Sequence, residues 1–204
     1  MKVDVECAPC LLHRGYMEIL EATNDKKLQF EAMMSLTRLL NKEFKPTAVA
    51  AWLGTKRDRL VKTVTGNSDP YAKKKLMSNQ RALEILPTVK RLIAQQSKPE
   101  RRLREALLAA IVGNIIEFDI LQHEFNFDNI EKLIQQAEQD LAVDEISRIV
   151  DLAGKAEEIL YLTDNSGEIA FDTLLVAELK KFGPRVTVAV KGKPIINDAT
   201  LQDA

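Results

Sequence analysis

The chain is short of the features that mark several classes of protein. It has only two cysteines, and a chain of 204 residues buries roughly 70% of its unfolded surface, so it needs neither a disulfide nor a metal to fold. Lys and Arg number 29 and Asp and Glu 30, without the basic excess that nucleic-acid binding usually shows. No apolar run approaches the ~20 residues of a membrane span, and the acidic first residues do not form a signal peptide. We therefore expect a cytoplasmic protein with no nucleic-acid and no membrane partner.

Glycine is also scarce until late in the chain. Residues 1–153 hold half of the 8 glycines, and residues 154–204 hold the other half. The longer part instead carries apolar residues at helical spacing. One of its helix starts is strong, because Asp69 can accept hydrogen bonds from first-turn amides and Pro70 suits the first helical position. The sequence predicts an all-helical domain over residues 1–155.

The apolar pattern changes its period after this helical part. Residues 159–163 form a short run of strand-forming side chains, which we interpret as a buried strand. Residues 169–182 form an amphipathic helix that Gly183-Pro184 closes, and residues 186–190 form a second strand. A strand, a helix and a strand in this order predict a right-handed crossover with parallel strands.

Two parallel strands cannot bury both faces of a sheet. We therefore expect residues 156–204 to be the first part of a larger α/β domain, in a chain that is a fragment or whose sheet another segment completes. The predicted fold class is thus multi-domain, an α domain followed by the start of a parallel α/β domain.

Polar segments follow both expected strands, at residues 164–168 and 191–198. In open parallel sheets, ligands bind outside the carboxyl ends of the strands. Oxygen atoms of Asp164, Asn165 and Asp198 would suit a hard divalent cation such as Mg²⁺ or Mn²⁺. These residues are candidate metal ligands.

An anion could bind beside the same segments. The amides around Gly167 lie at an expected helix N-terminus, and Lys191 and Lys193 could balance the charge of a phosphate. A metal, a lysine and a helix N-terminus at one place are what phosphoryl chemistry requires. The alternative interpretation is structural, since residues 164–167 also make a good turn and Asn197 with the following residue a good helix cap. No Gly-rich phosphate loop is present in the sequence.

Residues 164–172 and 190–200 together resemble the signature of the damage-control phosphatases, long catalogued as domain of unknown function eighty-nine. The resemblance covers essentially the whole chain. Further matches to the smaller prokaryotic branch of that family lie in the N-terminal half: Cys7-Ala8-Pro9-Cys10, Asp69-Pro70-Tyr71, Lys74, Asn79 and Gly113-Asn114.

The resemblance implies a helical domain joined to a Rossmann-like α/β domain. It implies a divalent metal (Mg²⁺, Mn²⁺, Ni²⁺ or Co²⁺) held by Asp164, Asn165 and Asp198. The implied reaction is the hydrolysis of phosphate monoesters of small, often damaged, metabolites such as sugar phosphates, with attack on phosphorus by polarised water or a nearby aspartate. The site residues that it indicates are Asp164, Asp198 and Glu168 for catalysis, and Lys191, Asn197, Gly167, Asn114 and Asp69 for the substrate. For Asn114, a polar residue in an apolar helix, we favour the alternative of a hydrogen bond at the domain interface. Family members continue for many tens of residues past the position of Asp203.

The two cysteines form a separate motif. Cys7 and Cys10 stand in a CxxC that opens a helix, with His13 close by, but a zinc site would lack a secure fourth ligand because the other histidine, His123, is distant. We favour a pair of small, buried helix-start residues. A redox site or a second metal site is the alternative, because a helix N-terminus lowers a thiol pKa.

Two other functions fit the same pattern of elements. A nucleotide-cofactor transferase such as a methyltransferase uses Rossmann-like sheets, although a Gly-rich first loop is lacking here. A non-catalytic metabolite-binding module is the other alternative. Thermal stabilisation by Mn²⁺ or Mg²⁺, and further by phosphate, separates the phosphatase from both.

Overall fold

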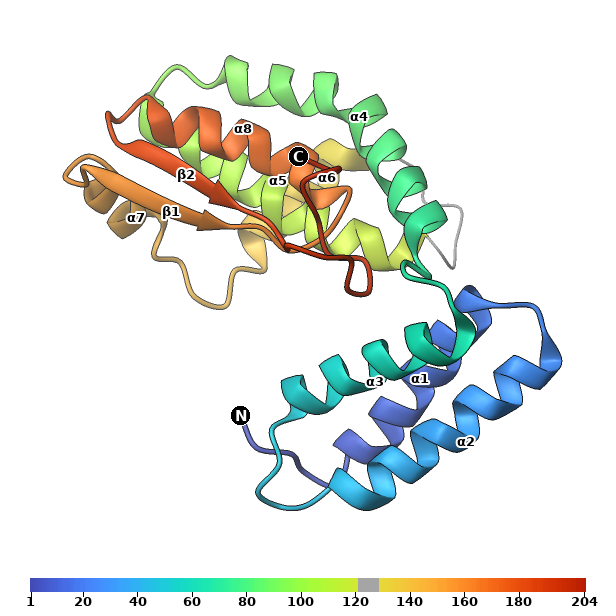
Figure 1. Ribbon diagram of the computed structural model, residues 1–204. Helices are drawn as coiled ribbons and strands as arrows, with labels where there is room; N and C mark the ends of the chain where they lie inside the picture. Colours follow the sequence, from blue (N-terminus) through green and yellow to red (C-terminus); the bar gives the residue numbers. More distant parts are fainter. Residues whose placement is uncertain (121–128) are drawn as a thin grey trace. The chain divides into compact units, whose positions relative to one another are not determined.

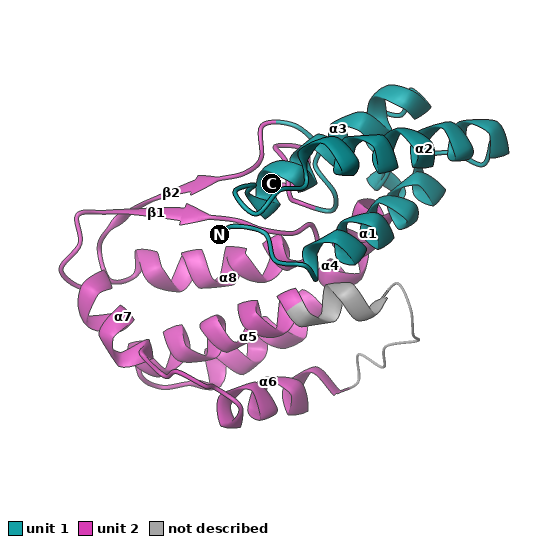
Figure 2. Ribbon diagram, turned by 90° about the horizontal axis from the view of Figure 1, so that it is seen from below, with its two compact units in different colours: residues 1–73, 193–197 teal, residues 74–192, 198–204 magenta. Residues whose placement is uncertain are grey.

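The computed structural model describes residues 1–120 and 129–204, which form two compact units (Figure 2). Unit 1 comprises residues 1–73 and 193–197, and unit 2 comprises residues 74–192 and 198–204. None of the described helices is long and apolar enough to cross a membrane.

Unit 1 contains three helices, α1 (Cys7–Ala22), α2 (Lys26–Glu43) and α3 (Ala50–Thr65) (Figure 1). Asp25 caps α2, because its carboxylate accepts the backbone N–H groups of Lys27 and Leu28 at 2.7 and 3.3 Å. Gly66, with φ of 72°, ends α3 in the left-handed conformation. Four leucines that face one another between the helices form the main core cluster of this unit: Leu11, Leu36, Leu40 and Leu53.

A loop from late in the chain, residues 193–197, packs on α3 within unit 1. Lys62 Nζ donates to the backbone oxygen of Pro194 at 2.7 Å and to the Asp58 carboxylate at 2.8 Å. Asp58 also accepts the backbone N–H of Ile196, at 3.5 Å. Ile196 has φ of 45°, where a β-branched residue is strained. These contacts with α3 therefore hold the loop in a conformation that costs it backbone energy.

Unit 2 has a larger core. Its elements are α4 (Ala72–Gln95), α5 (Pro99–Ile120), α6 (Ile130–Gln139), α7 (Ile146–Ala153), β1 (Glu158–Leu162), α8 (Glu168–Lys180) and β2 (Arg185–Ala189). Figure 2 shows the two strands, α8, α5 and α6 in successive layers. Leu103 and Leu108 of α5 share the core cluster with Phe171 and Leu175 of α8. The aromatic ring of Phe171 lies against Gly113, where an added Cβ would come within 2.6 Å of it.

The two strands pair in parallel, in a register that runs from Glu158 opposite Arg185 to Leu162 opposite Ala189. This confirms the predicted strand–helix–strand unit and its parallel strands. The prediction that the first strand is buried is wrong for one of its faces. Ile159 and Tyr161 pack against the core cluster, whereas Leu160 and Leu162 are 65% and 71% exposed, because no described element covers that face.

The chain is mostly helical with a small parallel sheet, as the sequence indicates. The units divide it differently from the expected domains, since residues 74–155 group with the strands. The cause is the apolar α5, which finds its partner in α8 rather than in the helices of unit 1. The Rossmann-like character, and domains 1–155 and 156–204 as independent folding units, stay predictions.

Candidate functional site

The candidate site of unit 2 lies where β1 ends and α8 begins. Ala199 donates its backbone N–H to the backbone oxygen of Asp164 at 2.7 Å, and Asn165 forms an isolated antiparallel bridge with Asp198. The two polar segments predicted to share a ligand are therefore neighbours in the structure. The three candidate metal ligands, Asp164, Asn165 and Asp198, lie on these paired segments.

Two carboxylates at this place share two amide donors. The side-chain nitrogen of Asn165 donates to Asp164 Oδ2 at 3.1 Å and to Glu168 Oε2 at 3.2 Å. The side-chain nitrogen of Asn114, from α5, donates to Glu168 Oε2 at 2.8 Å and lies 3.5 Å from Asp164 Oδ2. Asn114 thus finds its partner inside unit 2, at the candidate site itself. The arrangement holds two acidic groups side by side.

A lysine accompanies the third acid. Lys191 Nζ lies 3.3 Å from Asp198 Oδ2, and the Lys191 backbone N–H donates to the oxygen of Ala199 at 2.9 Å. The Lys191 side chain is 48% exposed and that of Asp198 is 18% exposed. A positive charge is therefore accessible beside the acidic group, as an anionic ligand requires.

The ligand types of the three candidate residues suit a hard divalent cation. Carboxylate and amide oxygens are the ligands that Mg²⁺ and Mn²⁺ prefer. The Asn165 side chain is almost fully buried and turns its amide nitrogen toward the carboxylates of Asp164 and Glu168, so its oxygen would face an ion beside Asp164 only after the amide turns over. Among the side chains that the structure describes, those of residues 1–114 and 129–204, no group of three or more His, Cys, Asp or Glu could hold a metal ion. The candidate ligands are two carboxylates and one amide, a combination that such a group of three acidic, His or Cys side chains does not include.

An apolar groove of about 510 Å³ adjoins the acidic cluster in unit 2. Three polar side chains line the groove: Asn114, Glu168 and Tyr161. The remaining lining is apolar: Leu107, Ala110, Ile111, Leu160, Leu162 and Leu175.

A buried acid that sequence reasoning missed lies one turn along α8. Asp172 is 3% exposed and accepts a hydrogen bond from the Tyr161 hydroxyl at 2.6 Å. Burial raises the pKa of Asp172 to about 6, against the opposing effect of the Tyr161 hydrogen bond, and the nearby charges of Glu168 and Asp164 raise it further. Burial, and then the bond to Asp172, raises the pKa of Tyr161 as well. The sequence carried a signal for it, since Asp172 is the last residue of the stretch 164–172 that resembles the family signature.

The backbone amide of Gly167 is already occupied by a protein acceptor. It donates to Asn79 Oδ1 of α4 at 2.6 Å. Gly167 has φ of 82°, and a Cβ there would come within 3.0 Å of Ser78. The glycine is thus required by backbone conformation and by the close approach of α4. An anion-binding role for this amide stays a prediction, and it would have to compete with Asn79.

The other predicted site residues belong to unit 1. Asp69 donates its backbone N–H to the side chain of Asn67 at 3.0 Å, and Asn197 is half-buried in the loop on α3. Cys7 and Cys10 are free thiols in the first turn of α1, as the helix-opening motif predicted. Cys10 is exposed, so the expectation of a buried pair is wrong for it, because that face of the first turn meets solvent. His123 lies outside the described residues.

Comparison with known proteins gives consistent matches over the whole chain. The family model of the damage-control phosphatase ARMT1-like domain matches residues 3–204. A damage-control phosphatase of Archaeoglobus fulgidus is 33% identical over 205 residues, covering 100% of this chain and 69% of that protein. An uncharacterized protein of Methanocaldococcus jannaschii is 38% identical over 207 residues, covering 100% of this chain and 67% of that protein.

A solved structure gives a match of the same kind. The crystal structure of a DUF89 family protein from Pyrococcus horikoshii superposes with a TM-score of 0.86 at 32% identity. The match covers 100% of this chain and 69% of that one.

Proposed function

The chain belongs to the family defined by the damage-control phosphatase ARMT1-like domain, and on this premise we propose that it takes part in the metal-dependent hydrolysis of phosphate monoesters of small, damaged metabolites such as sugar phosphates. One observation carries the proposal beyond the family. The paired segments bring Asp164 and Asn165 beside Asp198, with an exposed lysine next to the acids.

Asp164, Asn165 and Asp198 would hold the divalent cation through oxygen atoms. When bound, Mg²⁺, Mn²⁺, Ni²⁺ or Co²⁺ would supply positive charge that offsets the charge of the phosphoryl oxygens and would activate the attacking group. The chain's own part is to fix the ligands before the substrate arrives. Pairing of the Asp164 backbone with Ala199, and of Asn165 with Asp198, serves this purpose.

Glu168 is proposed to take the proton of the attacking water. Its Oε2 atom accepts the amides of Asn114 and Asn165 at 2.8 and 3.2 Å, so the carboxylate is held in one orientation toward Asp164. A general base must lie within hydrogen-bond reach of the proton that it takes, so a carboxylate fixed beside the candidate metal ligands suits this role. As the oxygen of this water bonds to phosphorus, the bond from phosphorus to the ester oxygen would break, and the alcohol would leave with a proton from solvent. An aspartate of the same site is the alternative nucleophile, and water would then hydrolyse the phosphoaspartate that it forms.

Lys191 is proposed to bind the phosphate. Its side chain is 48% exposed, and its ammonium group is anchored on one side by Asp198. Because phosphoryl transfer depends on positioning and charge stabilisation, a lysine at this point would orient the phosphate and offset its charge. Asn114 lines the apolar groove and is proposed to contact the substrate, while Gly167, Asn197 and Asp69 are further candidates from the sequence.

The test is phosphate release from a panel of small phosphate esters, with each of the four metals, by the chain and by Asp164→Ala. We expect metal-dependent release that the substitution abolishes. The matched control is Asp151→Ala, which removes an exposed acid of α7 in the same unit and should leave release unchanged. Undiminished release by Asp164→Ala sinks the assignment.

A further inference from the structure

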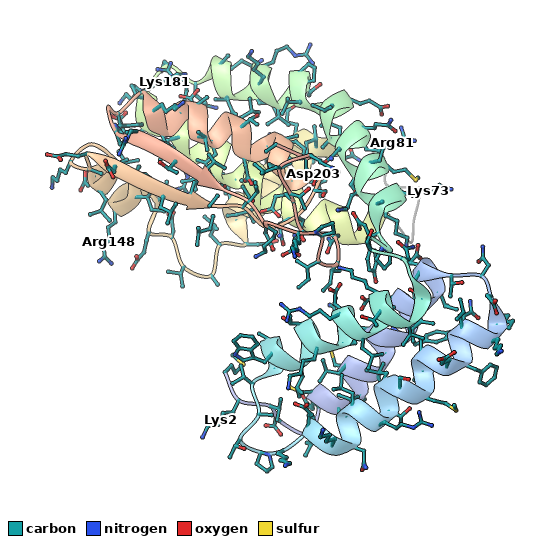
Figure 3. The ribbon with its side chains drawn as sticks, viewed as in Figure 1. Lys2, Lys73, Arg81, Arg148, Lys181 and Asp203 are labelled. Carbon is teal, nitrogen blue, oxygen red and sulfur yellow. The ribbon has the colours of Figure 1, made fainter. Side chains whose placement is uncertain are left out.

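The carboxylate of Asp203 joins three segments of unit 2 (labelled in Figure 3). Its Oδ1 atom accepts hydrogen bonds from Asn79 Nδ2 at 2.8 Å and from the hydroxyl of Ser166 at 3.1 Å. Its Oδ2 atom accepts the backbone N–H and the hydroxyl of Thr200, at 2.8 and 2.7 Å. One side chain thus binds α4, the turn before α8 and the segment after Asp198.

The first branch extends to the turn that carries two candidate metal ligands. Asn79 uses its nitrogen for Asp203 and its oxygen for the backbone N–H of Gly167, at 2.6 Å. Ser166 is fully buried, so its hydroxyl depends on protein acceptors. The turn that bears Asp164 and Asn165 is therefore tied to Asp203 at two consecutive residues, Ser166 and Gly167.

The second branch extends to the segment that carries the third candidate ligand. Thr200 and Asp203 close a turn, in which the acid accepts the amide and the hydroxyl of the residue three positions earlier. Ala199, between this turn and Asp198, donates its backbone N–H to the backbone oxygen of Asp164 at 2.7 Å. Asp203 thus binds both of the segments whose pairing sets the distances among the candidate ligands.

The charge of Asp203 is stabilised where it lies. Burial acts to raise its pKa, but the hydrogen bonds from Thr200 and Asn79 and the charge of Lys75 hold the pKa below its usual range. The carboxylate is therefore ionised at neutral pH, and charge-assisted hydrogen bonds are roughly twice as strong as neutral ones. An amide at this position cannot accept at both atoms, so Asp203→Asn loses the donors of one branch.

We propose that Asp203 is a positioning residue of the metal site, which aligns the turn at Asp164 and Asn165 with the segment at Asp198 through Ser166, Asn79 and Thr200. The inference rests on the proposed function, since it takes these three residues as metal ligands. Groups that orient ligands without touching the metal typically contribute about 10- to 100-fold to its affinity. The proposed role of Asp203 requires no contact with the ion.

The experiment measures Mn²⁺ affinity by isothermal titration calorimetry for the chain and for Asp203→Asn, Asn79→Ala and Asp164→Ala. We expect a loss of affinity of about 10-fold or more in Asp203→Asn and a smaller loss in Asn79→Ala, which interrupts only the first branch. Asp140→Asn, an exposed acid of the same unit, controls for charge. Ile134→Val, which removes one methyl group from the same core, controls for lost stability.

Amide hydrogen exchange in the metal-free chain provides a second readout. The Gly167 amide should exchange faster in both Asp203→Asn and Asn79→Ala, and it should not change in Ile134→Val. Each variant is compared under conditions where its circular dichroism shows the same folded state as the unaltered chain. A variant that does not fold is replaced by Ser166→Ala, which removes a single donor to Asp203 and should weaken Mn²⁺ binding in the same direction.

The outcomes separate the two claims. If the chain binds Mn²⁺, Asp164→Ala abolishes binding and Asp203→Asn keeps the full affinity, the positioning role is wrong and the proposed metal site stands. Equal losses in Asp203→Asn and Ile134→Val also overturn it, because stability alone would then explain the effect. No Mn²⁺ binding by the unaltered chain contradicts both claims.

Discussion

The buried carboxyl group of Asp172 predicts an unusual dependence of stability on pH. It is 3% exposed, its Oδ1 atom accepts the Tyr161 hydroxyl, and its Oδ2 atom has no hydrogen-bond partner among the described residues. Its pKa rises from 3.8 to about 6 on folding, chiefly because burial penalises the charged form. The folded state therefore binds this proton more tightly than the unfolded state does.

The sign of the effect follows from linkage. A carboxyl group with a raised pKa stabilises the fold at low pH, and this contribution is lost as the pH rises from the unfolded pKa of 3.8 through about 6. At about 1.4 kcal/mol per pKa unit, the whole shift corresponds to about 3 kcal/mol. Most acids that gain partners on folding show the opposite trend.

The assay is urea unfolding followed by circular dichroism, for the chain and for Asp172→Asn. Subtraction of the variant removes the titration of all other groups. We expect the unfolding free energy of the chain, minus that of the variant, to fall by about 2 kcal/mol between about pH 4 and about pH 7.5. The hydrogen bond from Tyr161 holds the pKa of Asp172 down. Tyr161→Phe removes that bond and raises the pKa further, so the fall should extend to higher pH. A difference that is constant, or that rises with pH, refutes the reasoning.

Two further predictions concern packing in each unit. Gly113→Ala should destabilise unit 2 by about 1–3 kcal/mol, because its Cβ would come within 2.6 Å of the buried Phe171 ring; urea unfolding measures this, and an unchanged midpoint contradicts it. Lys62→Met should loosen the 193–197 loop, since it removes the 2.7 Å bond to Pro194 and leaves the buried Asp58 without its cation. Limited proteolysis should then cut this loop at least about 10-fold faster, as expected for a lost bond of about 1.5 kcal/mol to a charged group, and equal cleavage rates would exclude an anchoring role.

Much of the local structure could be predicted from the sequence because its determinants are local. Strand-forming residues at 159–163 and a closing Gly183-Pro184 place β1 and α8 to within a few residues. Which face of β1 meets the core could not be predicted, because a continuous apolar run has no alternation to mark it. The partner of α5 was equally hidden, since a helix that is apolar on most sides can pack on any apolar surface.

The candidate site shows the same division. Asp164, Asn165 and Asp198 could be brought together in advance, because the ends of parallel strands meet at one edge. The Asn79 to Asp203 hydrogen bond joins residues 124 positions apart. No local sequence pattern marks such a pair. The two residues meet only because α4 packs close to the turn at Gly167 in the folded chain.

The central claim is that Asp164, Asn165 and Asp198 form one divalent-metal site, and Mn²⁺ calorimetry of the chain and of Asp198→Ala tests it most directly. The account predicts saturable binding of one ion by the chain and no detectable binding by the variant, whose circular dichroism stays that of the folded chain. Saturable binding with the same affinity in both proteins would contradict the account.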